Sequence, residues 1–306
     1  MYKLKDLKGI IPALMTPFDK NGEYDESAAK EMINWMIDMG VGGFYLTGSN
    51  GHGPFMEAEE RMRVVESMTK IVDGRVPVMA HIAAVSSKVS AKLAAHAKTA
   101  GCTAVSAVPS YYYKLTPEQM YDYYTDIANA SDLPLVIYAM TDQYTPSVGM
   151  FAKLNEIERV AGLKFTGSDH YMLGRIKEHL GKDFIIYSGK DEMIVSGLAA
   201  GADGAIGGTY NVIPDLYIRC VNEMWNGDMK EAQKDLLAAN AILEVWFKYE
   251  LSAAMRASLE FIGVNAGYNP APIRTLDAVA KAALKKDLQE LKDRLQIKPI
   301  ALFEAI

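Results

Sequence analysis

Short hydrophobic runs alternate with longer amphipathic stretches along most of the chain. A stretch of helical pattern follows each run, as in a chain built from strand–helix units. The second helical stretch opens with the acids of Glu57–Glu60, which suit the positive end of a helix dipole, and the alanine-rich third stretch runs from Ser86 to Ala100 and stops at Gly101. The predicted strands are Gly9–Pro17, Gly43–Thr47, Pro77–Ala83, Ala104–Val108, Pro134–Met140, Val160–Phe165, Phe184–Ser188 and Gly204–Gly208.

Eight strands that alternate with helices of this length favour parallel pairing and closure into a (β/α)8 TIM barrel, an α/β fold. A doubly wound open sheet is the alternative, but it normally carries a G-x-G-x-x-G turn after its first strand, and Pro12 to Asn21 has none. After the eighth unit only helical patterns remain, at Asp228–Lys248, Leu251–Phe261 and Thr275–Gln296. We therefore expect a catalytic barrel over residues 1–225 and a C-terminal helical appendage over residues 226–306.

Composition and charge narrow the class of protein. The 306 residues are 50% hydrophobic and 23% charged, with a net charge of −6, which is ordinary for a globular protein and argues against nucleic-acid binding. No apolar run approaches the roughly 20 residues of a membrane span, and the polar first nine residues predict no signal peptide. Cys102 and Cys220 lie far apart and predict two thiols in a reducing cytoplasm. The five histidines show no metal-ligand spacing, so we expect no metal.

Lys164 is the first candidate for chemistry, because active sites of such barrels lie at the C-terminal ends of the strands. It stands inside the apolar strand Val160–Phe165, where an ammonium is costly unless it is paired or used. One interpretation is a lysine that reaches solvent or pairs with Asp191 or Glu192. The other is a nucleophile made reactive by desolvation or nearby cations. At an ordinary pKa near 10.4, only about four amines in ten thousand are neutral at pH 7.

Other strand ends carry further candidates. Tyr138 ends the fifth strand, and its phenol could move protons beside an amine nucleophile or simply pack in the core. The glycine-rich loop Gly48–Gly53 could present backbone N–H groups to an anion, although it lacks the P-loop lysine. Asp191 and Glu192 follow the seventh strand, where they could bind the hydroxyls of a polyol or merely decorate a helix N-terminus. The tyrosines Tyr111–Tyr113 favour a subunit interface or a site wall.

Two segments carry a specific resemblance. Gly162–Lys164 and Gly197–Asn211, together with Gly9–Ala13 and Thr16–Phe18, resemble the pyruvate-dependent class I aldolase family of N-acetylneuraminate lyase and dihydrodipicolinate synthase. The resemblance extends over the whole chain, and Gly197–Asn211 is similar to the lyase branch in particular. It implies the barrel fold, a 2-oxo acid substrate with a sugar-derived aldehyde as the second partner, and no cofactor beyond the covalent imine on the lysine.

The resemblance also implies residue roles. Lys164 matches the Schiff-base lysine, and Tyr138 matches the proton-relay tyrosine. Ser49 and Asn50 match the two residues that hold the carboxylate of the 2-oxo acid. Tyr112 matches a tyrosine that a neighbouring subunit lends to the relay, which implies a homo-oligomer, usually a tetramer of two tight dimers. The positions that match the wall of the lyase sugar pocket are Thr166, Gly189, Asp191, Glu192 and Gly208.

Three departures from the family pattern bear on the second substrate. The family has Gly-Ser/Thr-Thr-Gly-Glu where this chain has Gly48–His52, and Asn50 supplies no hydroxyl. The family's Tyr-Asn-x-Pro is here Tyr138–Thr141, followed by a shorter loop. Gly208 stands where some lyases have serine.

We expect a retro-aldol lyase acting on a sialic-acid-like or other 2-oxo-3-deoxy sugar acid. Dihydrodipicolinate synthase is the main alternative. Its second substrate carries another carboxylate, yet no arginine or lysine lies between Ala139 and Gly149, and Asp191 and Glu192 would repel that group. A dehydratase using the same imine also remains open. A non-catalytic barrel that senses oxo acids is disfavoured, because Lys164 and Tyr138 are both present and a sensor needs no proton shuttle.

Overall fold

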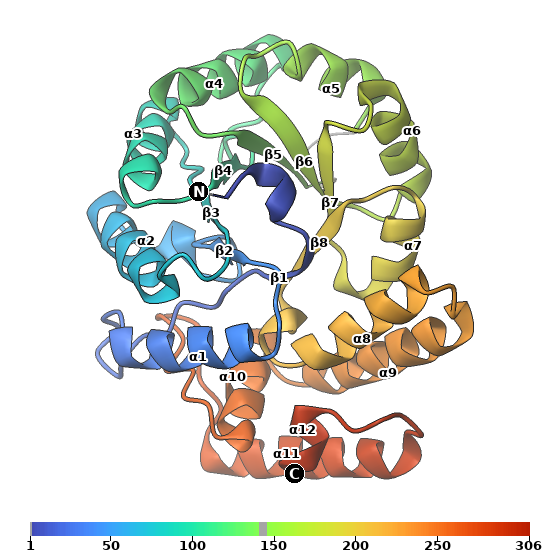
Figure 1. Ribbon diagram of the computed structural model, residues 1–306. Helices are drawn as coiled ribbons and strands as arrows, with labels where there is room; N and C mark the ends of the chain where they lie inside the picture. The colour runs from blue at the N-terminus through green and yellow to red at the C-terminus, as the bar shows by residue number, and fades with distance from the viewer. Residues whose placement is uncertain (1, 141–145) are drawn as a thin grey trace.

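The computed structural model describes residues 2–140 and 146–306, and eight parallel strands form its centre (Figure 1). Their order in the sheet is β1-β8-β7-β6-β5-β4-β3-β2, and a bridge between Ala13 and Tyr45 joins β1 to β2, so the sheet closes into a TIM barrel. The predicted fold class is confirmed. The strands are β1 (Gly9–Pro12), β2 (Phe44–Leu46), β3 (Val78–His81), β4 (Ala104–Ala107), β5 (Leu135–Met140), β6 (Val160–Thr166), β7 (Ile185–Ser188) and β8 (Gly204–Gly207).

Five predicted strands end one to five residues earlier than expected, and the first two of them do so for clear local reasons. The first was expected to reach Pro17 but ends at Pro12, and only Ala13 continues the pairing, through an isolated bridge. The second was expected to include Thr47, whose φ of 51° is left-handed and incompatible with a strand. Both shortened strands end at the mouth of the barrel, where the chain turns to form the loops of the candidate site.

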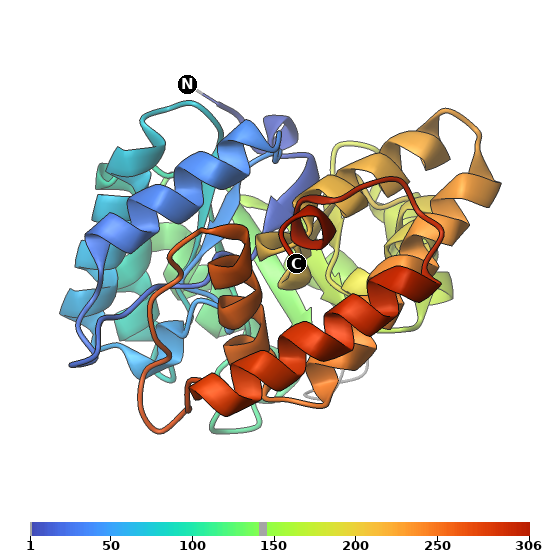
Figure 2. The same ribbon diagram turned by 90° about the horizontal axis from the view of Figure 1, so that it is seen from below.

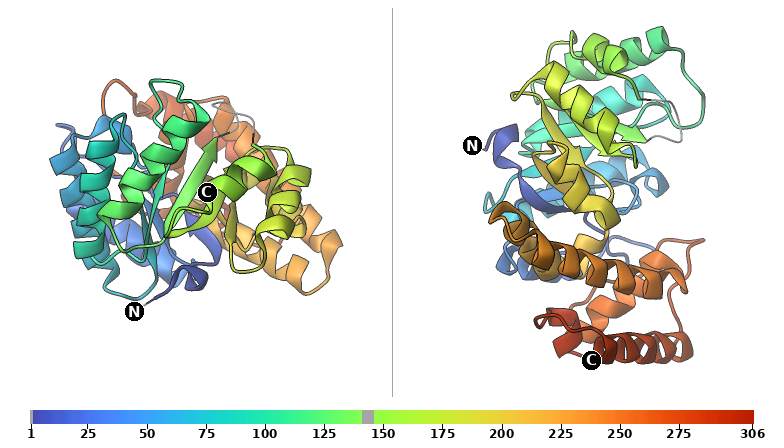
Figure 3. Two further views of the ribbon diagram at one scale, coloured as in Figure 1. Left: turned by 90° about the horizontal axis from the view of Figure 1, so that it is seen from above. Right: turned by 90° about the vertical axis from the view of Figure 1, so that its right-hand side faces the viewer.

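Helices surround the barrel on the outside (Figures 1 and 3). Several begin at a side-chain cap: the Asp25 carboxylate accepts from the backbone N–H of Ala28, and Thr116 and Gln119 form a capping box around Pro117. The helices of the barrel are α1 (Glu26–Asp38), α2 (Ala58–Val72), α3 (Ser87–Thr99), α4 (Pro117–Ala130), α5 (Val148–Leu154), α6 (His170–Leu180), α7 (Ile194–Ala199) and α8 (Pro214–Trp225).

One end of the barrel is closed by the start of the chain. The short 3-10 helix η1 (Leu4–Asp6) lies across the N-terminal ends of the strands, as Figure 1 shows. The buried Tyr187 hydroxyl, rising from β7, lies 3.3 Å from the carbonyl oxygen of Leu4 and donates to that of Leu7 at 3.0 Å. Access from solvent is therefore left to the opposite end, where the strands finish.

The C-terminal helices lie along one side of the barrel (Figures 2 and 3). They are α9 (Met229–Phe247), α10 (Leu251–Ile262), α11 (Ala278–Arg294) and α12 (Ala301–Glu304). The boundary that we predicted at residue 226 falls between α8 and α9, and α9 packs against both α8 and α11. The division into barrel and appendage remains a prediction, since the appendage shares one hydrophobic core with the barrel.

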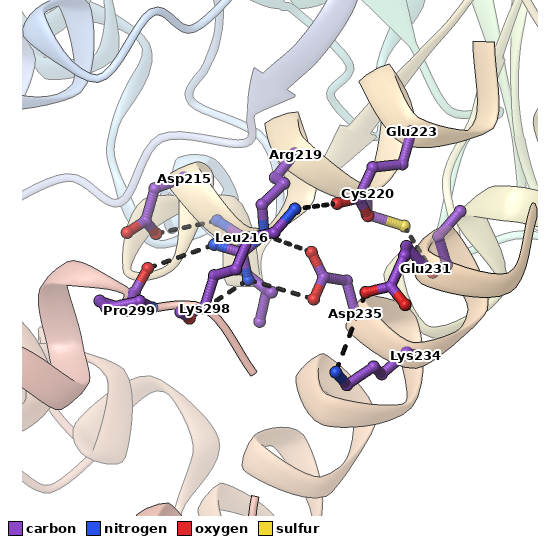
Figure 4. Close-up of polar contacts among 11 residues, drawn as sticks. Asp215, Leu216, Arg219, Cys220, Glu223, Glu231, Lys234, Asp235, Lys298 and Pro299 are labelled. Carbon is purple, nitrogen blue, oxygen red and sulfur yellow. Dashed lines mark hydrogen bonds and ion pairs between the residues drawn. The ribbon is translucent and has the colours of Figure 1, made fainter. Parts of the chain in front are cut away.

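A polar clamp ties the last segment of the chain to α8 and α9 (Figure 4). Arg219 on α8 forms an ion pair with Asp235 on α9, whose carboxylate is 3% exposed. The same guanidinium donates to the carbonyl oxygens of Pro299 and Lys298 at 3.2 and 3.5 Å. The backbone N–H of Ala301 donates to the Asp215 carboxylate at 2.7 Å, so the clamp holds α12 in place.

Over the described part of the chain, no helix is long and apolar enough to cross a membrane. Within the same residues, no group of three or more His, Cys, Asp or Glu side chains is arranged to hold a metal ion. Cys102 and Cys220 are buried free thiols.

Candidate active site

Lys164 lies in the mouth of the barrel beside Tyr138. The two residues are direct partners in the register of β5 and β6, and neighbours in register point to the same side of a sheet. The Lys164 Nζ lies 3.6 Å from the centroid of the Tyr138 ring and 5.5 Å from that of Tyr45. It also donates to Thr166 Oγ1 at 3.4 Å, and the side chain is buried. Lys164 forms no close ion pair with Asp191 or Glu192 among the described residues, although the Asp191 carboxylate interacts electrostatically with it at longer range.

The surroundings of Tyr138 favour its ionised form more than its burial alone would allow. Burial raises the pKa of the phenol, but the Lys164 ammonium and hydrogen bonds from Lys164 and Thr166 outweigh burial, so the pKa lies below its usual value of 10. A phenol whose pKa is lowered by an adjacent amine is suited to proton exchange with that amine.

An aromatic and polar layer supports these two side chains, and we did not predict it from the sequence. The ring of His81 meets the Tyr138 ring edge-on, with centroids 6.0 Å apart and planes at 80°, and Tyr45 does the same at 6.3 Å and 88°. Arg61 lies behind His81, with its Nη2 3.0 Å from His81 Nδ1 and its Nη1 donating to the carbonyl of Ala83 at 2.7 Å. Burial, with the nearby charges of Arg61 and Lys164, holds the pKa of His81 well below 6.5, so this histidine is neutral.

The signal that could have revealed this layer is the histidine itself. His81 falls within the predicted strand Pro77–Ala83, and an ionisable residue inside an otherwise apolar barrel strand is costly unless neighbours satisfy it. Metal-ligand spacing of the histidines carries no information about an arginine partner, so it did not indicate Arg61 on α2.

The loop after β2 forms a compact turn at the same mouth. The N–H of His52 donates to the Ser49 carbonyl at 3.1 Å, and the N–H of Gly53 donates to the Gly48 carbonyl at 3.0 Å. The Thr16 hydroxyl ties the turn to the end of β1 by donating to the Gly51 carbonyl at 2.7 Å. Ser49 is exposed on this turn, as a residue that meets a ligand would be.

His52, which replaces the family's glutamate, lies inside this turn. It has a left-handed φ of 53°, is 5% exposed, and packs edge-on against Phe18 and Phe55. Burial, together with the charge of Arg256, lowers the pKa of His52 to about 4, so this side chain supplies no positive charge to the site near neutral pH.

Asp191 and Glu192 do not act as an equivalent pair. Asp191 is buried and accepts from the Thr209 N–H at 2.8 Å and from the Thr209 hydroxyl at 2.6 Å, which fixes the chain after β8. Burial raises the pKa of Asp191. Glu192 is half-exposed, and its carboxylate lies 3.2 Å from the Lys190 ammonium. The combined negative charge that we expected at this edge is therefore smaller than two free carboxylates would supply.

Gly189 and Gly208 leave room for side chains of the site that a Cβ would press against. A Cβ at Gly189 would lie 2.1 Å from Thr166 Oγ1, so only glycine leaves room for the hydroxyl that receives the Lys164 hydrogen bond. A Cβ at Gly208 would lie 3.2 Å from the amide of Asn50. The mouth thus brings together all the predicted site residues except Tyr112.

Tyr112 projects away from the chain. It is 75% exposed, and its ring contacts the ring of Tyr113 at 5.0 Å between centroids. That position suits the predicted contact with a second subunit, which stays a prediction. Thr141, and the shortened loop that we noted there, fall within residues 141–145 and lie outside the described residues.

Comparison with known proteins finds relatives of one family, both in sequence and in structure. The model of the dihydrodipicolinate synthetase family matches residues 6–291. An N-acetylneuraminate lyase of Rhizobium meliloti is 31% identical over 283 residues, which cover 92% of this chain and 94% of the relative. The solved structure of a catalytic lysine mutant of the Ruminococcus gnavus sialic acid aldolase has a TM-score of 0.90 at 28% identity, covering 97% of this chain and 100% of that one. A dihydrodipicolinate synthase of Bacillus anthracis has a TM-score of 0.87 at 28% identity, with coverage of 93% and 98%.

Proposed function

The chain belongs to the dihydrodipicolinate synthetase family, and we propose that it is a Schiff-base lyase that cleaves a sialic-acid-like 2-oxo-3-deoxy sugar acid into pyruvate and an aldehyde. The family and the lyases among its relatives indicate a pyruvate-dependent lyase; the imine and the sugar acid are what we infer. The observation that carries the proposal is the buried Lys164 ammonium, which lies 3.6 Å from the Tyr138 ring and forms no ion pair with a carboxylate among the described residues.

The proposed reaction begins when neutral Lys164 attacks the C2 carbonyl of the sugar acid. A proton moves from the amine to the new alkoxide, water leaves, and an imine remains. The Tyr138 phenol is hydrogen-bonded to Lys164, so it lies within reach of the amine whose protons it would carry. Despite burial, the charge of Lys164 lowers the pKa of Tyr138 below its usual value, which favours proton exchange between the phenol and the amine.

Cleavage follows from the imine. The imine nitrogen takes up a proton, a base removes the proton of the C4 hydroxyl, the C3–C4 bond breaks, and its electron pair moves into the protonated imine to give a neutral enamine and a free aldehyde. The enamine takes a proton at C3, and water then hydrolyses the imine to pyruvate and regenerates the Lys164 amine. The water released on imine formation balances the water consumed here, so no cofactor is needed.

Binding of the 2-oxo acid carboxylate falls to the loop of Ser49 and Asn50 in this proposal. The turn there is closed by backbone hydrogen bonds, and Ser49 is its exposed residue at the mouth. The exposed Tyr112 supports a homo-oligomer, which we propose to be a tetramer, and the free buried thiols suit a cytoplasmic protein.

Dihydrodipicolinate synthase activity is the competing function, because two structural neighbours have that name. No arginine or lysine lies between Ala139 and Gly149 to bind the second carboxylate of its aldehyde, and His52 is neutral near pH 7. Lys190, which follows β7 at the same mouth, is paired with Glu192. These features favour a neutral-tailed sugar acid. An assay of pyruvate release from a panel of sugar acids, beside condensation with aspartate semialdehyde, separates the two functions.

Borohydride reduction in the presence of pyruvate tests the imine directly. We expect one reduced pyruvyl group per chain, located by peptide mass spectrometry on Lys164. Lys164→Ala should abolish the label, whereas Lys190→Ala, a matched change at the half-exposed lysine of the same mouth, should retain it. A label that persists in Lys164→Ala or that maps to Lys190 contradicts the proposal.

A further inference from the structure

Asn50 is held in place by the end of the first strand. Its Nδ2 donates to the Ala13 carbonyl at 2.9 Å, and the Nδ2 of Asn211 donates to the same oxygen at 2.8 Å. Since a carbonyl only accepts, this contact fixes which end of the Asn50 amide is the nitrogen. The side-chain amides of Asn50, after β2, and Asn211, after β8, thus meet at Ala13, directly after β1. Ala13 also forms the bridge to Tyr45 that closes the barrel between β1 and β2.

Gly208 lies against the flat face of the same amide. A Cβ built at Gly208 would lie 3.2 Å from Asn50 Nδ2, 3.2 Å from Oδ1 and 3.3 Å from Cγ. Three nearly equal distances mean that the Cβ would press on the plane of the amide, and they are tighter than ordinary van der Waals contact. Asn50 cannot retreat freely, because its hydrogen bond to Ala13 holds it.

The remaining edge of the Asn50 amide is an acceptor. Among the described residues, Oδ1 has no hydrogen-bond partner, and the side chain is half-buried. Asn50 and Gly208 lie near Lys164 through two contacts. Gly207, the neighbour of Gly208, lies against Asp191, since a Cβ at Gly207 would be 2.0 Å from Asp191 Oδ1. The Asp191 carboxylate in turn interacts electrostatically with Lys164. An unpaired acceptor at this mouth suits a hydroxyl donor and opposes a carboxylate.

We propose that Asn50 and Gly208 form one specificity element, in which the glycine makes room for the amide and the amide oxygen accepts a hydrogen bond from a hydroxyl in the aldehyde half of the substrate. This inference rests on the proposed function and gives the Asn50 side chain a different task from holding the 2-oxo acid carboxylate. The carboxylate is then left to Ser49 and the backbone of the turn. Because the glycine makes room for the amide, substitutions at the two positions should have non-additive effects on kcat/KM.

A double-mutant cycle tests the coupling. The variants are Asn50→Thr, Gly208→Ser and the double variant, with Gly149→Ser on α5 as the matched control, since a Cβ at Gly149 meets nothing within 4 Å. Two readouts are taken on each: kcat/KM for the best sugar acid of the panel, and kcat/KM for 4-hydroxy-2-oxopentanoate, which gives the same pyruvate but an aldehyde without hydroxyls. Borohydride trapping of pyruvate measures imine formation separately.

We expect each single variant to lose about tenfold in kcat/KM for the sugar acid, and the double variant to lose several-fold less than the product of the two. The hydroxyl-free substrate should change much less, and Gly149→Ser should match wild type on all readouts. Singles whose effects simply multiply, or an equal loss on both substrates, would overturn the inference while trapping on Lys164 still upholds the imine. Failure of trapping in the wild-type chain overturns the imine itself and the inference with it.

Discussion

The variant Tyr138→Phe, which removes only the hydroxyl oxygen, separates the packing of the Tyr138 ring from the proposed proton transfer by its hydroxyl. In Tyr138→Phe the ring remains, so the contact of the Lys164 ammonium with its face, 3.6 Å from the centroid, is preserved, as is the packing against His81 and Tyr45. The hydroxyl that we propose to carry protons is lost. General acid–base catalysis by one group typically contributes 10²–10⁴-fold, or about 3–5 kcal/mol of the barrel's transition-state stabilisation.

The assay measures both halves of the chemistry on the same protein. Steady-state pyruvate release should fall by about 10²–10⁴-fold, while borohydride trapping at saturating pyruvate should still reach one label per chain, only more slowly. Tyr45→Phe is the matched control. Its ring also faces Lys164, but at 5.5 Å, and its hydroxyl donates to Ser106 Oγ at 3.2 Å, so turnover should stay within a few-fold of wild type. Turnover near the wild-type value in Tyr138→Phe would show that another group moves the protons.

Three further outcomes can be checked independently. His52 has a pKa of about 4 in the folded chain against 6.5 when unfolded, so its contribution to stability is complete above pH 6.5 and is lost as the pH falls toward 4. His52→Asn removes this titration, and asparagine tolerates the left-handed backbone at that position. In urea unfolding, the variant should therefore lose less free energy of unfolding than wild type between pH 6.5 and pH 4, by at most about 3 kcal/mol. Arg219→Ala leaves the Asp235 carboxylate buried without its cation and should cost about 3–5 kcal/mol in urea unfolding, against less than about 1 kcal/mol for Lys98→Ala at an exposed ion pair. Glu192→Ala should raise KM for the sugar acid in cleavage far more than KM for pyruvate in the reverse direction, and an equal rise in both would contradict a role for Glu192 in binding hydroxyls.

The alternation of short strands with helical stretches was enough to predict the fold, because strand–helix units of that size leave few ways to bury their apolar faces. Strand ends at the mouth were harder to predict. The chain from Ala13 to Pro17 reads as a continuous apolar strand, yet it leaves the sheet after Ala13 and is held by hydrogen bonds to Gly207 and Asn211 instead. Those bonds join residues almost two hundred positions apart, which local pattern does not encode.

In the candidate site too, some residues could be predicted from the sequence and some contacts could not. Lys164 and Tyr138 could be identified from their strands, since a lone lysine in an apolar barrel strand demands an explanation. The Arg61–His81 contact could not, because it links a helix to a strand through a histidine that local pattern leaves ambiguous. The charge of Glu192 was overestimated for a related reason: its contact with Lys190 depends on rotamers that residue order does not reveal.

Two of the three departures from the family pattern lie on the β1 side of the barrel, and the third begins directly after Tyr138 in β5. Lys164 and Tyr138 come from the adjacent strands β6 and β5, where the residues expected for imine chemistry are retained. Asn50 and His52 follow β2 and Gly208 follows β8, the two strands that flank β1 in the barrel. A substrate bound through its carbonyl carbon to Lys164 extends across the mouth, so different parts of it meet different sides. Chemistry common to the family can therefore stay constant on one side while the β1 side changes to suit another aldehyde. On this argument, exchanging residues 50 and 208 together should shift which aldehyde is released and leave the lysine label unchanged.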